Sequence, residues 1–181
     1  MRGIGSVPFL LAAIGILAAL IWIYRSGKRA SPSPVRHTSQ RTQSGAVVPS
    51  QWGYRVRKNS HPVEGVEDPR LSCAALLVLV ADLDGGISKA EKDCIFKQLR
   101  TTLGLPPAKA PDVYETAIWL CNQEADRDEM VRRLIRHTVS LGGYETLPDM
   151  IQMVSEVGKA DTGTLTDDTA LVVEKLKLLN A

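Results

Sequence analysis

An uncharged apolar run near the amino terminus constrains the fold of this chain more than any other feature. Residues 4–24 read IGSVPFLLAAIGILAALIWIY and contain no charged side chain. A helix of that length rises about 30 Å, which matches the hydrocarbon thickness of a bilayer. Trp22 and Tyr24 lie at the end of the run, where amphipathic rings favour the membrane interface. We therefore expect a single transmembrane anchor over residues 1–25.

The flanks of this run predict its orientation and argue against its removal. The alternative interpretation is a cleavable signal peptide, but only one Arg precedes the run and no A-x-A-like cleavage site precedes the polar boundary. Arg25, Lys28 and Arg29 follow the run, so the positive-inside rule places the carboxyl-terminal side in the cytoplasm. In a bacterial cell, the prediction is an inner-membrane, single-pass protein with its amino terminus outside.

Charge divides the chain into two unlike parts. Residues 1–67 carry nine Lys and Arg against two Asp and Glu, a net charge of +7. Residues 68–181 carry thirteen Lys and Arg against eighteen Asp and Glu, a net charge of −5. A basic arm beside a bilayer attracts anionic lipid. The acidic part lacks the basic face that phosphates require, so nucleic-acid binding is not expected.

Residues 26–67 have the composition of a flexible basic linker. They contain the cluster SPSP, many Ser, Thr and Gln residues and little apolar periodicity, so they bury too little area to offset chain entropy. One stretch is richer, because QWGYRVRK at residues 51–58 interleaves two aromatic with three basic side chains. Two interpretations of this stretch stay open. It docks on lipid headgroups or a partner, or it is an extended arm that packs on the following domain.

From Asp68 onward, apolar residues recur with the 3.6-residue period of helices. Asp68 is a candidate N-cap, and Pro69 suits the first helical position. The run LLVLV that follows is apolar all round, so this helix is expected to be central and buried. Further helices are expected over about residues 88–103, 111–123, 127–141, 147–159 and 167–179. No strand pattern interrupts them, so residues 68–181 predict an all-α bundle of about six helices.

Two of these helices have faces that the pattern defines in detail. In the last helix, the predicted core stripe consists of Leu171, Val172, Val173, Leu176 and Leu179. In the helix over 127–141, basic side chains lie opposite the apolar face: Arg132, Arg133, Arg136 and His137. Such a face is either solvated or able to grip an acidic partner.

Catalytic and zinc-site patterns are missing from the sequence. No Ser/His/Asp set, G-x-G-x-x-G, G-K-[ST] or H-E-x-x-H occurs, and His137 is the one histidine after residue 67, so an enzyme is not expected. The cysteines Cys73, Cys94 and Cys121 fall on helical stretches without a C-x-x-C pair. We interpret them as buried free thiols in a reducing compartment rather than zinc ligands.

The turn ADLDGGISKAE, which ends at Glu91, is the candidate site. Asp82, Asp84 and Glu91 offer oxygen ligands for a hard cation, and two glycines let the backbone turn tightly. If Glu91 occupies position 12 of an EF-hand loop, Asp84 and Asp82 occupy positions 5 and 3, but position 1 falls on Val80, which cannot ligate. The other interpretation is structural, because Ser88 and Glu91 form the S-x-x-E capping box of a helix.

This turn also resembles that of TerB-like domains of the tellurite-resistance family. The family motif A-x-x-D-G-x-I-S-x-x-E, preceded by an apolar helix, is matched by Ala81, Asp84, Gly85, Ile87, Ser88 and Glu91. A degraded second copy, VGKADTGTLTDDT, occupies residues 157–169. In this copy Asp161 occupies the position of Asp84, and Thr169 occupies the position of Glu91. The resemblance covers about residues 68–181.

The resemblance implies an all-helical domain whose two turns meet at one end and cluster carboxylates there, a cluster proposed to bind a divalent cation. The implied ligands of Ca²⁺ or Mg²⁺ are Asp82, Asp84, Glu91, Asp161 and Asp168. The alternative, in which these residues cap helices or meet solvent, stays open. An anchor followed by a TerB-like domain also resembles the front part of membrane-bound DnaJ-type co-chaperones, although this chain contains no His-Pro-Asp of a J domain.

Together these features predict a membrane-tethered, non-enzymatic helical module at the cytoplasmic face. We expect it to act as a scaffold or sensor in a response to metal, tellurite or envelope stress, with a protein partner that the sequence does not identify. The alternative is a degenerate EF-hand-like Ca²⁺ sensor that uses the loop over residues 82–91. In that case cation binding would open the helices that flank the loop.

Overall fold

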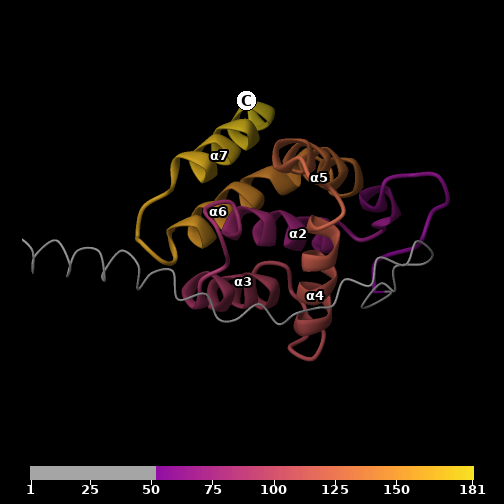
Figure 1. Ribbon diagram of the computed structural model, residues 1–181, viewed down its shortest axis with the longest axis horizontal. Coiled ribbons are helices and arrows are strands. Elements are labelled where there is room, and N and C mark those ends of the chain that lie inside the picture. The colour runs from indigo at the N-terminus through magenta and orange to yellow at the C-terminus, as the bar shows by residue number, and fades with distance from the viewer. Residues whose placement is uncertain (1–51) are drawn as a thin grey trace, which may run out of the picture. The chain divides into compact units, whose positions relative to one another are not determined.

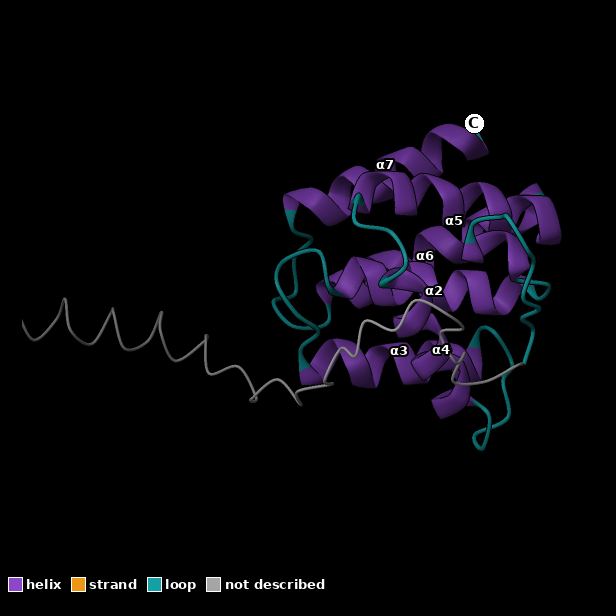
Figure 2. Ribbon diagram, turned by 45° about the vertical axis from the view of Figure 1, so that its right-hand side comes forward, coloured by secondary structure: helices purple, strands orange, loops and turns teal. Residues whose placement is uncertain are grey.

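The computed structural model describes residues 52–181, and this part of the chain is helical (Figure 1). The α-helices are α2 (Pro69–Ala81), α3 (Lys89–Thr101), α4 (Ala110–Cys121), α5 (Arg127–Gly142), α6 (Leu147–Lys159) and α7 (Asp167–Asn180). Two short 3₁₀-helices accompany them: η1 (Pro62–Gly65) precedes α2, and η2 (Tyr144–Thr146) lies between α5 and α6. The prediction of an all-α domain with six helices is confirmed (Figure 2).

Helix α2 forms the centre of the domain. It lies between α3 and α4 on one side and α5 and α7 on the other, and α3, α4, α5 and α6 all contact it (Figure 2). Every residue of α2 from Leu71 to Ala81 is buried, as its uninterrupted apolar sequence predicts. The helix begins as expected, because the Asp68 carboxylate accepts the N–H of Arg70 at 2.9 Å and Pro69 occupies the first turn.

The segment over residues 52–67 is part of this domain, which corrects the predicted flexible linker over 26–67 for these residues. Tyr54, Val63 and Val66 are buried in the same core as α2. The Tyr54 ring meets Trp119 of α4 edge-on, with ring centroids 5.3 Å apart, and an isolated β-bridge pairs Tyr54 with Val66. Of the two interpretations of the aromatic and basic stretch, the structure places its described residues in an arm that packs on the domain.

The predicted anchor over residues 1–25, like the linker up to residue 51, lies outside the described residues. Among the helices of residues 52–181, none combines the length and the apolar character needed to cross a bilayer.

Candidate functional site

The first turn of the predicted site joins α2 to α3 and is built around a helix cap. Ser88 Oγ accepts the N–H of Glu91 at 3.2 Å, and the Glu91 carboxylate accepts the N–H of Ser88 at 2.8 Å. This is the predicted capping box. Gly85 and Gly86 have φ angles of +111° and +133°, which side-chain-bearing residues rarely adopt. The glycines therefore allow the reversal, and the box fixes where α3 begins.

The second turn, between α6 and α7, follows the same plan with threonines. Thr166 Oγ1 accepts the N–H of Thr169 at 3.4 Å and donates to Thr169 Oγ1 at 3.0 Å. Thr169 is buried, as Glu91 is at the equivalent place in the first turn. The end of α6 lies so close to α7 that a Cβ on Gly158 would be 2.5 Å from Thr169 Cγ2 and 3.0 Å from Leu165 Cδ2. Glycine is thus the residue that fits this approach.

Charged residues of both turns affect the pKa of one carboxyl group, that of Glu91. Burial raises the pKa of Glu91, and the negative charges of Asp84 and Asp161 raise it further. Asp84 belongs to the first turn and Asp161 to the second, so both turns lie at the same end of the bundle (Figure 2). Within residues 52–181, neither aspartate forms an ion pair.

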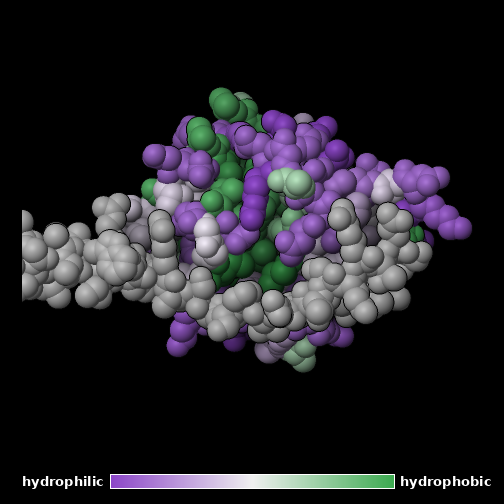
Figure 3. Space-filling view, in the orientation of Figure 1, coloured by the Kyte–Doolittle hydropathy of each residue, from purple (hydrophilic) through white to green (hydrophobic). Residues whose placement is uncertain are grey.

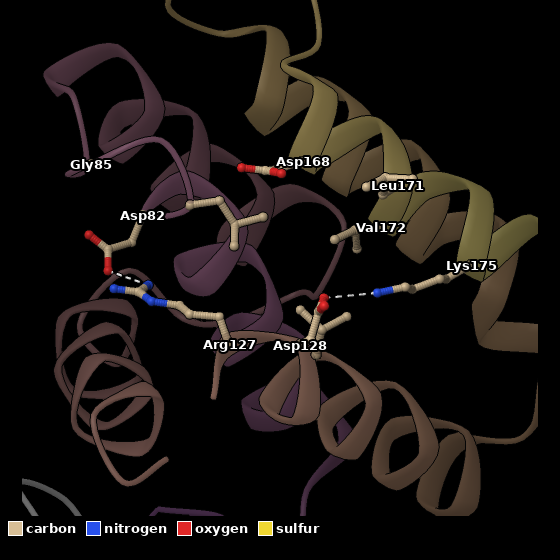
Figure 4. A pocket seen from close by; sticks show the side chains of 10 residues that line it. Asp82, Gly85, Arg127, Asp128, Asp168, Leu171, Val172 and Lys175 are labelled. Carbon is tan, nitrogen blue, oxygen red and sulfur yellow. Dashed lines mark hydrogen bonds and ion pairs between the residues drawn. The ribbon is translucent and has the colours of Figure 1, made fainter. Parts of the chain in front are cut away.

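The other two predicted ligands line a cavity beside the first turn. Asp82 and Asp168 line a cavity of about 390 Å³ between the first turn and helices α5 and α7 (Figure 4). Asp82 forms an ion pair with Arg127 at the start of α5, and Asp128 forms one with Lys175 of α7 at 3.0 Å. Sequence analysis did not identify Arg127, Asp128 or Lys175 as residues of this cavity. Lys175 follows Asp168 by seven residues, which is two helical turns, so the two side chains share one face of α7.

The carboxylates, as placed, do not fit a divalent cation. Ca²⁺ and Mg²⁺ require about six or more oxygen ligands around one point. Within the described part of the chain, no three His, Cys, Asp or Glu side chains gather with the spacing of metal ligands. The Glu91 carboxylate is engaged by the N–H of Ser88, and that of Asp82 by Arg127. The first EF-hand position falls on Val80, which is buried inside α2.

Beyond Lys175 the space between α5 and α7 continues as an apolar groove of about 320 Å³. We call it the apolar half of the α5–α7 cleft, and it is lined by Arg132, Ile135, Arg136, Lys175, Leu178 and Leu179. Figure 3 shows hydrophobic side chains near the carboxyl-terminal end of α7 and in a band below it on the same face. Leu178 is 77% exposed and Leu179 45%. The predicted core stripe of α7 is therefore corrected, because Val172, Val173 and Leu176 are buried while Leu171 and Leu179 are not.

The cysteines of the domain are free thiols. Burial raises the pKa of both Cys73 and Cys121 to about 12, and the Cys121 thiol donates to the carbonyl of Ala75 at 3.1 Å. Cys94 on α3 is half-buried, and desolvation raises its pKa as well. These thiols are poor nucleophiles, since the thiolate is the reactive form.

A comparison with known protein families identifies the family of this domain. Residues 70–180 match the family model described as tellurite resistance protein TerB. Comparison with curated proteins and with solved structures gives no match. The matched span runs from the first turn of α2 to the last turn of α7, includes both helical turns of the site and covers more than half of the 181 residues. With its helical fold and its two capped turns, the chain belongs to the TerB family of tellurite resistance proteins.

Proposed function

We propose that the chain is a membrane-tethered, non-enzymatic TerB module that serves as a scaffold or sensor at the cytoplasmic face. The family match supports a role in the response to tellurite or a related stress. The uncharged run over residues 4–24 supports the tether, and the basic residues after it support the orientation. The observation that carries the proposal is the open apolar half of the α5–α7 cleft, on a domain whose central helix is otherwise fully covered.

An apolar surface of this kind favours a binding role. Leu171, Leu178 and Leu179 are exposed on one helix, whereas α2 and its neighbours form a closed core. Contiguous exposed apolar groups in a soluble domain mark interaction sites more often than catalytic ones. The charged side chains that line the adjoining cavity are held largely in the two ion pairs Asp82–Arg127 and Asp128–Lys175. The cleft therefore offers contact area rather than free acid and base groups.

The tether is tested by fractionation. The full chain and a variant lacking residues 4–24 are expressed in a bacterium, and the membranes are washed with alkaline carbonate. We expect the full chain in the membrane pellet and the deletion variant in the supernatant. The same distribution for both chains would refute the tether, while the family assignment of residues 70–180 would stand.

The scaffold role is tested by crosslinking pull-down from these membranes, with and without tellurite. We expect a protein that crosslinks to the full chain and is lost when Leu178 and Leu179 are both replaced by serine. Lys89→Ser, an exposed substitution on α3, is the control and should leave the crosslink unchanged. A set of crosslinked proteins that is identical for all three chains would refute the proposal.

The Ca²⁺ sensor is the alternative, and calorimetry separates it from the scaffold. The full chain in detergent is titrated with CaCl₂ and, separately, with MgCl₂. The scaffold proposal expects no micromolar binding, because the carboxylates divide between two places and two of them are already engaged. Micromolar Ca²⁺ binding that disappears in Glu91→Gln would favour the sensor instead.

A further inference from the structure

The apolar half of the α5–α7 cleft has a lining that suits a bound helix. Leu178 and Leu179 of α7 supply its apolar walls, Ile135 of α5, which is 3% exposed, lies at its floor, and hardly any polar surface lies between them. An extended peptide laid there would leave its backbone N–H and C=O groups without partners, which is costly away from water. A helix satisfies those groups internally, so a helical occupant suits this lining.

The rim of the groove is positively charged. Arg132 and Arg136 flank it, and their charge is only partly compensated. The Glu129 carboxylate serves three guanidinium groups, those of Arg132 at 3.0 Å, Arg133 at 3.4 Å and Arg136 at 3.6 Å. Arg133 does not line the groove, so Arg132 and Arg136 share one carboxylate there and one positive charge is in excess at the rim. Residues 52–181 as a whole carry sixteen Lys and Arg against twenty Asp and Glu, so the positive rim is opposite in sign to the net charge of the domain.

We propose that this groove docks an amphipathic helix of a partner protein whose polar edges carry carboxylates. The proposal rests on the proposed scaffold function and names the chemistry of its partner. Apolar side chains at positions i, i+3 or i+4, and i+7 of that helix contact Ile135, Leu178 and Leu179. Its carboxylates meet Arg132 and Arg136, where bidentate guanidinium contacts fix its orientation.

Charge argues against the chain's own undescribed segment as the occupant. Residues 1–51 contain no Asp or Glu and six Lys or Arg. Like charges placed beside Arg132 and Arg136 would repel, and the uncharged run over 4–24 has no carboxylate to offer them. A separate acidic helix is therefore the occupant that matches the groove.

Fluorescence anisotropy with a labelled synthetic peptide tests the proposal on the full chain in detergent. The probe is a helix of about 15 residues with Leu at i, i+4 and i+7 and Glu on the flanking positions. A second peptide carries Lys in place of each Glu. We expect saturable binding of the Glu peptide and at least tenfold weaker binding of the Lys peptide, since several charged contacts distinguish them.

Two double variants locate the binding. Leu178→Ser with Leu179→Ser, and Arg132→Gln with Arg136→Gln, should each weaken the Glu peptide by about tenfold or more. Arg57→Gln with Lys58→Gln removes two exposed charges of the arm and should leave the affinity unchanged. Circular dichroism confirms that each variant folds, which is expected because the replaced side chains lie on the surface or at the end of α7.

Other occupants appear as separate outcomes. Failure of the Glu peptide to bind, or equal binding by the leucine variant, overturns the proposal. So does binding of phosphatidylglycerol vesicles by the chain without residues 4–24, if the leucine variant loses it. A dimer that the leucine variant abolishes would assign the groove to a second copy. In each case the crosslinking experiment still tests the scaffold function, and the carbonate wash the tether, independently of the peptide.

Discussion

Replacing Gly158 by alanine should destabilise this protein, although the same change normally stabilises a helix. Alanine is favoured over glycine inside a helix by about 1 kcal/mol. At Gly158, however, the new Cβ would lie 2.5 Å from Thr169 Cγ2 and 3.0 Å from Leu165 Cδ2. Thr169 is 2% exposed, and its hydroxyl accepts from Thr166 at 3.0 Å, so its methyl group cannot turn away without loss of that hydrogen bond.

The two effects can be weighed. Overpacking of a closed site costs about 1–3 kcal/mol, so the net change for Gly158→Ala is a loss of about 1 kcal/mol of unfolding free energy. Thr169→Ser alone removes a buried methyl group and should cost about 1 kcal/mol. In the double variant the overlap with Cγ2 is gone, so alanine regains its helical advantage. The coupling energy between the two positions is therefore expected to be about 1–2 kcal/mol.

Urea denaturation of the full chain in detergent, followed by far-ultraviolet circular dichroism, measures all four forms. The described helices dominate this signal. If Gly158→Ala stabilises the wild-type chain, or the coupling energy is below about 0.3 kcal/mol, the close approach of α6 and α7 is not as described.

Three further predictions use the same preparations. Because the pKa of Glu91 is raised, the folded chain holds this proton more tightly than the unfolded chain does. The stability that the proton adds is therefore fully present below the ordinary carboxyl pKa, and it is lost as the pH rises through the raised pKa. Glu91→Gln should remove this loss and leave the chain at least as stable at pH 7 in urea titrations; a variant clearly weaker at that pH would contradict the reasoning. Iodoacetamide at pH 8 should modify at most Cys94 in the native chain and all three thiols in urea, as mass spectrometry can count, and rapid native modification of Cys73 would refute its burial. Tyr54→Ala should lower the free energy of unfolding in urea by about 2–4 kcal/mol, whereas Arg57→Ala should change it by less than about 0.5 kcal/mol. Equal unfolding midpoints for the two variants would refute the packing of the arm on the domain.

Helix starts could be predicted from the sequence because caps are local. Asp68 and Ser88 each bind a backbone N–H within three residues, so the side chain that begins the helix stands next to it in the sequence. The bounds of α6, expected at 147–159, are those observed. The family resemblance of the first turn has the same origin, since its glycines and capping box form one contiguous motif.

Features that depend on distant residues could not be predicted in this way. Helix α7 is apolar on most sides, so its periodicity does not indicate which face meets α6, and packing selects Val173 and Leu176 over Leu178. The arm over 52–67 has no periodicity, yet its scattered apolar side chains fill gaps in the core. The sequence also placed Asp82 among possible metal ligands, because nothing near it along the chain indicates that Arg127 forms its ion pair.

The burial of α2 has a consequence for how the protein is synthesised. Among the α-helices of the described domain this one is synthesised first, but α6, which helps to enclose it, is complete only about 80 residues later. At usual elongation rates that interval lasts roughly 4–16 s, during which α3, α4 and α5 are added in turn and the cover of the most apolar helix of the domain is still incomplete. Proteolysis of stalled nascent chains should find α2 cleavable until residue 159 has emerged. The order of the helices therefore leaves part of the α2 surface open to water until the last helices of the domain have been synthesised.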